Sequence, residues 1–249
     1  MLEEVTGRVK MCVDAGNRPR ILVLTGSGIS AESGIKTFRG TDSLSQTDWD
    51  GQQVGKVASI TAMDTDPSTV NRFFAGRRED MYRSEPNAAH EALADLEEIL
   101  DEHMFVVTQN VDSLHELAGS DRVCHMHGDL DTVRCRMCAT VFQWPAEFAP
   151  DMTCDRCGGG IRPNVVLFGE VPMHLEAVSH LLTKCDIFVA IGTSGLVYPA
   201  SEFSEVAAAH GALTVHINMI KTPGHFACSL LGPATITVPA FVDVVRAAL

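Results

Sequence analysis

The sequence predicts an α/β fold, in which a doubly wound parallel sheet carries a smaller inserted domain. Three observations lead to this fold class. Short apolar runs end in glycine turns, amphipathic helical patterns alternate with those runs, and two Cys-x-x-Cys pairs interrupt the alternation. Strands that alternate with helices are typical of a parallel sheet with helices on both faces.

The first half of the chain begins the alternation. Residues 20–25 form a β-branched apolar run, which predicts a strand buried on both faces, and a glycine turn follows it. A helix is expected to open over residues 30–34. The polar stretch 40–66 has little periodicity and is predicted to be a long surface loop. Asp66 and Pro67 predict the start of a helix that ends near residue 82.

The second half continues the same pattern. Apolar residues at helical spacing predict an amphipathic helix over residues 87–100. The remaining predicted strands are 105–108, 123–126, 165–168, 186–191 and 213–217, and the remaining predicted helices are 175–182 and 199–210.

Composition excludes several classes of function. The 249 residues carry a net charge of −13, which repels phosphate backbones, so we expect no direct nucleic-acid partner. No apolar run approaches the ~20 residues that span a bilayer, so no membrane partner is expected. The first twenty residues lack the apolar stretch of a secretory leader. We therefore expect a cytoplasmic protein.

Four of the eight cysteines form two pairs, Cys135-x-x-Cys138 and Cys154-x-x-Cys157, with fifteen residues between the pairs. Two such pairs provide four thiolates for a tetrahedral Zn²⁺ and leave no position open for water. We predict a structural zinc ribbon over residues 129–163, with four free or redox-active cysteines as the alternative. Acidic residues balance the arginines around the pairs, so the ribbon lacks the basic patch of a nucleic-acid module.

The segment Gly26-Ser27-Gly28-Ile29-Ser30-Ala31 follows the first strand and fits the pattern G-x-G-x-x-G/A. Such glycines let the backbone approach a pyrophosphate at a helix N-terminus, so a Rossmann-like dinucleotide site is predicted, with a plain strand–helix turn as the alternative. The acidic residue usual about twenty positions later has no strand beneath it, which disfavours a hydride-transferring dehydrogenase. Asn218, which follows strand 213–217, could hold a ribose hydroxyl instead.

Polar side chains follow two further predicted strands. Gln109, Asn110 and Asp112 come after strand 105–108 and suit a polar ligand, although a capped helix start is the alternative. His127 follows strand 123–126 and precedes the cysteine pairs, at a junction between domains, where ligands commonly bind. A histidine placed there is a candidate general base, and a hydrogen-bonded structural histidine is the more ordinary interpretation.

These segments belong to a longer series of motifs. They are Thr25-Gly26-Ser27-Gly28-Ile29-Ser30-Ala31-Glu32-Ser33-Gly34-Ile35, Thr37-Phe38-Arg39, Pro86-Asn87-Ala88-Ala89-His90, Thr108-Gln109-Asn110-Val111-Asp112-Ser113-Leu114-His115, Met126-His127-Gly128, the two cysteine pairs, Arg162-Pro163-Asn164-Val165-Val166-Leu167-Phe168-Gly169-Glu170, and Gly192-Thr193-Ser194. The series resembles the sirtuins, the family of NAD-dependent protein-lysine deacylases, and is most similar to the bacterial-type class III members. The match runs in the family's order from about residue 20 to the C-terminus.

The resemblance implies a role for each motif. His127 would be the general base, with Asn110 also catalytic. The residues that would bind NAD are Gly26, Ser27, Gly28, Ser30, Ala31, Phe38, Arg39, Gln109, Asn110, Asp112, Gly192, Thr193, Ser194, Asn218, Met219, Ile220 and Ala234. The residues that would bind the substrate are Phe74, Arg77, Val165, Val166, Phe168, Gly169 and Glu170, and the last five would take the acyl-lysine peptide as an added strand.

The resemblance also implies the architecture and the reaction. Residues 1–249 would form one catalytic domain, with a large Rossmann-like lobe made of 1–39, 85–128 and 164–249 and a small lobe made of 40–84 and 129–163. NAD would be consumed, and nicotinamide, 2′-O-acyl-ADP-ribose and free lysine would be released. One structural zinc ion and a monomeric state are expected. The alternatives are a mono-ADP-ribosyltransferase of the same fold and a sensor of NAD or ADP-ribose without turnover.

The chain departs from the family pattern in ways that concern acyl specificity. Class III members carry a Tyr-x-x-Arg pair that binds the carboxylate of succinyl and malonyl groups, whereas Phe74-Ala75-Gly76-Arg77 stands at the matching place. Arg77 retains two parallel N–H donors for a carboxylate. The resemblance therefore implies deacetylation with additional desuccinylase or demalonylase activity, and a solvent-exposed Arg77 in a plain deacetylase is the alternative.

Overall fold

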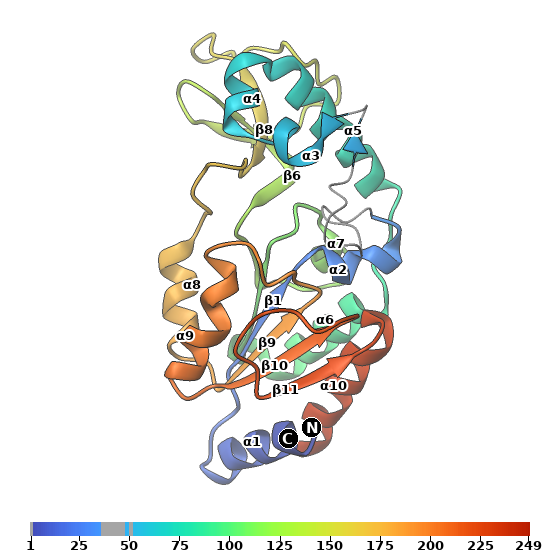
Figure 1. Cartoon of the computed structure of the whole chain (residues 1–249), viewed down its shortest axis with the longest axis vertical. Coiled ribbons are helices and arrows are strands. Elements are labelled where there is room, and N and C mark those ends of the chain that lie inside the picture. The colour runs from blue at the N-terminus through green and yellow to red at the C-terminus, as the bar shows by residue number, and fades with distance from the viewer. Residues whose placement is uncertain (1, 36–47, 50–51) are drawn as a thin grey trace.

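A computed structural model describes residues 2–35, 48–49 and 52–249 (Figure 1). Its larger part is a six-stranded sheet in which every neighbouring pair of strands is parallel, as predicted. The strand order is β11 (Cys228–Leu231), β10 (Leu213–Asn218), β9 (Ile187–Ile191), β1 (Ile21–Thr25), β4 (Met104–Thr108) and β5 (Val123–His125).

Helices cover both faces of this sheet (Figure 1). One layer contains α1 (Leu2–Asp14), α6 (Ala88–Leu100) and α10 (Ala234–Ala248), and the other contains α8 (Leu175–Leu182) and α9 (Phe203–Ala209), with a 3-10 turn at Ala200–Glu202. The alternate side chains of β1 divide between the two layers. Ile21 and Val23 join the first core, whereas Leu22 and Leu24 join the second, because successive residues of a strand point to opposite faces.

A smaller unit lies at the end of the molecule opposite the two termini (Figure 1). It contains an antiparallel sheet with the strand order β7 (Val141–Gln143), β6 (Gly128–Cys135) and β8 (Ile161–Val165). The helices α3 (Val54–Val57), α4 (Ile60–Thr65) and α5 (Pro67–Tyr82) pack on this sheet in one core, and a short hairpin, β2 (Asp48–Trp49) and β3 (Gln52–Gln53), precedes them. Asn71 of α5 also donates to Pro150 O and Ile161 O at 2.8 and 3.0 Å.

The two long predicted helices begin where their capping residues place them. The Asp66 carboxylate accepts the Thr69 N–H at 3.1 Å and Pro67 occupies the first turn of α5. Asn87 and His90 form a reciprocal capping box at the start of α6. Both caps are local in sequence; the first was predicted from Asp66 and Pro67, whereas the second helix was predicted from its apolar spacing alone.

Three predictions about elements are wrong. Residues 40–66 are not a loop throughout, because α3 and α4 lie within them and bury Val54, Val57 and Met63. The first helix does not open at Ser30, because α2 spans Ser27–Ser30 and a 3-10 turn spans Ala31–Ser33. Residues 165–168 are not a separate strand, since β8 ends at Val165.

Several observed elements were not expected from the sequence. They include α1, β11, α10, the short helix α7 (Leu114–Leu117) and a 3-10 turn at Asp101–His103. Pro239 lies inside α10, where it removes a backbone donor, and the helix persists because Phe241, Val242 and Val245 are buried against the sheet. Among the described helices, none has the length and apolar character required to cross a membrane.

Candidate active site

Two glycine loops meet where the strand order of the large sheet reverses, between β1 and β9. The Gly28 N–H donates to Gly192 O at 3.0 Å. A Cβ on Gly28 would lie 2.6 Å from Gly192 Cα, and Gly192 itself has φ +62°. Neither loop accepts a side chain at these positions. Open α/β sheets bind ligands at such a reversal, beyond the carboxyl ends of the strands.

Ser30, Asn110 and Asp112 form a buried polar cluster beside these loops. Asn110 Nδ2 donates to Ser30 Oγ at 3.0 Å and to Gly26 O at 3.3 Å, and Ser30 Oγ donates to Asp112 Oδ2 at 3.1 Å. Burial raises the pKa of the Asp112 carboxyl, and its hydrogen bonds to Leu114 and Ser30 oppose that rise. Ser30, predicted to contact a pyrophosphate, here orients the two polar side chains of the next loop.

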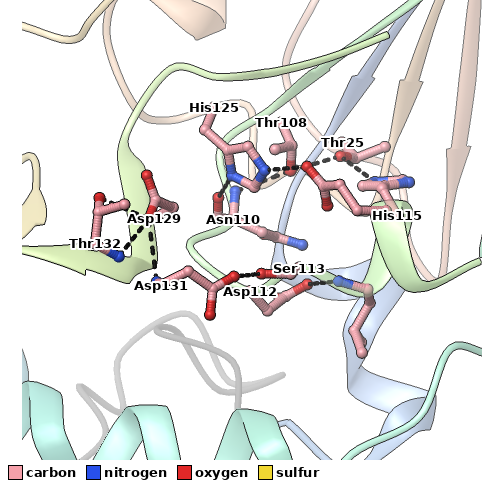
Figure 2. A network of polar contacts seen from close by, with 12 residues as sticks. Thr25, Thr108, Asn110, Asp112, Ser113, His115, His125, Asp129, Asp131 and Thr132 are labelled. Atoms are coloured by element: carbon pink, nitrogen blue, oxygen red, sulfur yellow. Dashed lines mark hydrogen bonds and ion pairs between the residues drawn. The ribbon is translucent and has the colours of Figure 1, made fainter. Parts of the chain in front are cut away.

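A line of buried side chains supports Asn110 (Figure 2). Thr108 Oγ1 accepts the Asn110 backbone N–H at 3.0 Å and the Thr25 hydroxyl at 2.8 Å, and Thr25 Oγ1 lies 3.0 Å from His115 Nε2. Burial lowers the pKa of His115 well below 6.5, so its ring is neutral at neutral pH. Asn110 is therefore held by a neutral hydrogen-bonded support that connects β1, β4 and α7.

His127 has the tautomer that a general base requires. Its Nδ1 lies 3.0 Å from Gln109 O, and because a carbonyl oxygen only accepts, Nδ1 carries the proton and the lone pair is on Nε2. Burial lowers the pKa of His127, and the Gln109 hydrogen bond only partly offsets this effect. The imidazole is thus neutral at neutral pH and able to accept a proton.

A second histidine, His125, binds the neighbouring carbonyl (Figure 2). Its Nδ1 lies 3.1 Å from Asn110 O and its Nε2 lies 2.7 Å from Glu116 Oε1. Burial lowers the pKa of His125, but the hydrogen bond and negative charge of Glu116 outweigh it and raise the pKa overall. His125 was not among the predicted site residues, although its two-residue offset from His127 next to a predicted strand is a signal for the same face.

The remaining residues predicted to bind NAD lie at the ends of β9 and β10 and at the start of α10. Asn218 Nδ2 donates to Thr193 O at 2.7 Å, which fastens the end of β10 to the loop 192–194. Met219 and Ile220 are exposed, at 60% each, and Ala234 is buried. These positions surround the same edge of the sheet as the glycine loops.

Arg77 faces the polar cluster, whereas Phe74 does not. A small hollow is lined by Ser27, Ile35, Arg77, Met81, Asn110, Val111, Asp112 and Leu130. Phe74 is not among the described residues that line it: the residue is 3% exposed, and its ring packs edge-on against Phe73 with centroids 4.9 Å apart. Burial lowers the pKa of the Arg77 guanidinium, while the charges of Asp80 and Asp112 oppose this change.

The segment predicted to bind a peptide is largely committed to internal hydrogen bonds. The N–H groups of Val166 and Phe168 donate to His127 O and Ala58 O at 2.8 and 2.9 Å. Leu167 N–H donates to a Glu170 carboxylate oxygen at 2.8 Å and Glu170 N–H donates to Leu167 O at 2.9 Å. From Val166 to Glu170, only the Gly169 N–H has no acceptor among the described residues.

The four predicted metal ligands come together. The Sγ atoms of Cys135, Cys138, Cys154 and Cys157 all lie within 4.8 Å of one another. Thiolates 2.3 Å from a tetrahedral Zn²⁺ are about 3.8 Å apart, so the cluster fits that ion. A Cβ on Gly159 would lie 2.6 Å from Met137 Cβ and 3.0 Å from Cys135 Sγ, and glycine is therefore required beside the ligands.

Comparison with known proteins assigns the family. Residues 26–199 match the Sir2 family. The chain belongs to the Sir2 family. Over 242 residues it is 45% identical to the NAD-dependent protein deacylase of Escherichia coli strain K12, and the alignment covers 95% of this chain and 85% of that protein.

Solved structures of Sir2 proteins share the whole fold. A Sir2 homologue in complex with NAD is 35% identical with a TM-score of 0.86, and the match covers 99% of this chain and 94% of that one. A complex of Sir2 with a p53 peptide and NAD⁺ is 30% identical with a TM-score of 0.78, covering 94% of this chain and 97% of that one.

This Sir2-family chain thus brings most of the predicted site residues to one edge of the sheet. The glycine loops, the 109–112 loop, His127 and Arg77 are neighbours through the contacts given above. Phe38 and Arg39 lie outside the described residues. The carboxylate of Glu170 is bound within the protein, and the predicted pairing of this residue with the peptide as an added strand stays a prediction.

Proposed function

We propose that this Sir2-family protein is an NAD-dependent protein-lysine deacylase that releases nicotinamide, 2′-O-acyl-ADP-ribose and free lysine. The observation that carries the proposal is the geometry of His127. Its proton is fixed on Nδ1 by the carbonyl of Gln109, the residue that precedes Asn110 of the buried cluster. Its Nε2 has no hydrogen-bond partner among the described residues and can accept a proton. A protein that only sensed NAD would have no use for a base held in this way.

NAD, when bound, provides the ribose carbon that receives the acyl oxygen and nicotinamide as the leaving group. The glycine loops after β1 and β9 would hold its phosphates, and Asn110 and Asp112 its nicotinamide ribose. His127 would then take the proton of a ribose hydroxyl onto Nε2, so that this oxygen attacks the acyl carbon. The Gln109 carbonyl stabilises the resulting imidazolium through its hydrogen bond to Nδ1.

We further propose that the sheet lobe (1–39, 85–128 and 164–249) binds NAD and that the small lobe (40–84 and 129–163) completes the acyl-lysine site. The separate cores support this division, except that Val165 and Leu167 pack in the core of the small lobe. A peptide would use the Gly169 N–H as the donor of an added strand.

A cytoplasmic location follows from intracellular NAD and from thiols that must stay reduced to bind zinc.

A nicotinamide-release assay tests the proposed function. With NAD and an acetyl-lysine peptide, we expect release of nicotinamide in a 1:1 ratio to deacetylated peptide. Transfer of label from NAD to protein, without peptide deacylation, would identify a mono-ADP-ribosyltransferase instead. Absence of both signals from folded, zinc-loaded protein would identify a binding protein.

We also propose that Arg77 gives the enzyme a secondary activity on succinyl- and malonyl-lysine. Arg77 of α5 lines the same hollow as Asn110 and Asp112, where the acyl group would lie if Asn110 and Asp112 hold the nicotinamide ribose. A bidentate guanidinium suits an acyl carboxylate. Phe74, one turn earlier on the same helix, lacks the hydroxyl of the tyrosine that class III relatives carry, so desuccinylation would not be dominant.

Arg77→Met should remove desuccinylation and spare deacetylation. The lost charged hydrogen bond is worth about 1.5–3 kcal/mol, roughly a ten- to hundredfold fall in kcat/KM for succinyl peptide. Phe74→Tyr should raise kcat/KM for succinyl peptide. Arg72→Met, at an exposed position of α5, is the matched control and should change neither activity. An equal fall in kcat/KM for acetyl and succinyl peptides in Arg77→Met would show that Arg77 does not recognise the acyl group.

A further inference from the structure

The Glu170 carboxylate is the centre of a partly buried ion-pair network. Both of its oxygens lie 2.8 Å from an Arg162 nitrogen, and Oε1 also accepts from Arg134 at 3.0 Å. The Arg162 side chain is only 5% exposed and that of Glu170 19%. A buried guanidinium needs such a partner, because removing one member leaves an uncompensated charge.

The two arginines belong to the zinc-bearing sheet. Arg134 of β6 and Arg162 of β8 are directly opposite each other in the antiparallel register, and the next pair is Cys135 and Ile161. Like charges that face each other across strands are destabilising. Glu170 lies between the two guanidiniums and offsets this repulsion, so the sheet beside the metal ligands depends on a residue of the peptide segment.

The same carboxylate also closes the turn from Leu167 to Glu170. The backbone N–H of Glu170 donates to Leu167 O at 2.9 Å, with Gly169 at φ +97°, as in a type II turn. The backbone N–H of Leu167 donates back to Glu170 Oε2 at 2.8 Å. Within the part of the chain that the structure describes, the Gly169 N–H is then the donor of this turn that has no acceptor, and the reciprocal pair fixes its direction.

We propose that Glu170 is a positioning residue for the acyl-lysine peptide: it clamps the turn Leu167–Glu170 to the zinc-bearing sheet through Arg134 and Arg162 and does not itself touch the peptide. The inference rests on the proposed deacylase function. Its carboxylate has no oxygen left for a ligand, since two arginines and the Leu167 N–H already occupy both. The zinc ribbon thereby sets the affinity for peptide from a distance.

Glu170→Gln tests the proposal. The amide keeps one acceptor oxygen but loses the charge that both arginines bind, so we expect the KM and Kd for acetyl-lysine peptide to rise about tenfold. The KM for NAD and the zinc content should stay at the native values. Peptide Kd is measured by fluorescence anisotropy and zinc by a metal assay. Arg136→Met is the matched control, because Arg136 lies in the same ribbon but pairs with Asp64 of α4 at 2.8 Å, and its loss should leave peptide affinity unchanged.

A double-mutant cycle with Arg134→Met separates positioning from direct contact. If Glu170 acts through the arginines, the effects of Glu170→Gln and Arg134→Met on peptide Kd are not additive. Additive effects, or a native peptide Kd in Glu170→Gln, would overturn the proposal. If Glu170→Gln does not fold, Arg134→Met alone tests the proposal. A higher peptide Kd at native zinc content supports the clamp, and a native peptide Kd rejects it. Failure of the native chain to deacylate would instead reject the proposed function.

Discussion

His127→Tyr is expected to lower the deacylation rate by about 10²–10⁴-fold, the usual contribution of a general base. His127→Asn refines the test, since its amide can still donate to Gln109 O but has no basic nitrogen. Both variants should retain the native melting temperature. His180→Tyr, at an exposed position of α8, is the control and should be fully active. Normal nicotinamide release and deacylation by folded His127→Asn would rule out the assignment.

The direction of the His127 pKa shift predicts the pH profile. Burial lowers this pKa from 6.5, and only the neutral ring accepts a proton. The value of kcat/KM should therefore fall on the acid side only at a pH below 6.5. Above that pH the base is already deprotonated and the rate should not depend on this group. A measured acid limb above pH 6.5 would contradict the pKa shift.

Removal of zinc is expected to lower stability and activity together. A closed four-thiolate site contributes folding free energy, about 10–16 kcal/mol of binding in isolated zinc-finger peptides, and has no position for a nucleophilic water. Cys135 and Cys154 are buried in the same core as the helix that carries Arg77, so Cys135→Ala or chelation should also loosen that helix. The melting temperature, zinc content and nicotinamide release are measured in parallel.

Cys124→Ala is the control for the zinc experiment, because Cys124 lies in β5 outside the metal cluster. It should bind one zinc ion and melt close to the native temperature. Loss of activity at an unchanged melting temperature, after metal removal, would indicate a catalytic metal and contradict the structural role.

Features of the fold that depend on neighbours in sequence were predictable. The caps of α5 and α6 each lie within three residues of the groups they bind, and the apolar runs of β1 and β9 are buried on both faces as their composition requires. In contrast, α10 contains an internal proline, and β11 is defined by its pairing with β10. Local sequence gives no sign of the burial and strand pairing that stabilise these two elements.

The features of the candidate site likewise fall into those that local sequence predicts and those that depend on tertiary contacts. By itself, the sequence determined the four clustered cysteines and the glycine loop after β1, because metal-ligand spacing and turn chemistry depend on short segments. It also singled out His127 as a candidate base from its position after a strand. Only the tertiary structure decided that Ser30 orients Asn110 and Asp112, that His125 binds Glu116, and that the Glu170 carboxylate is taken up by two arginines. Each of these roles depends on hydrogen bonds between distant segments, and a carboxylate or hydroxyl in the sequence does not reveal whether such a partner already occupies it.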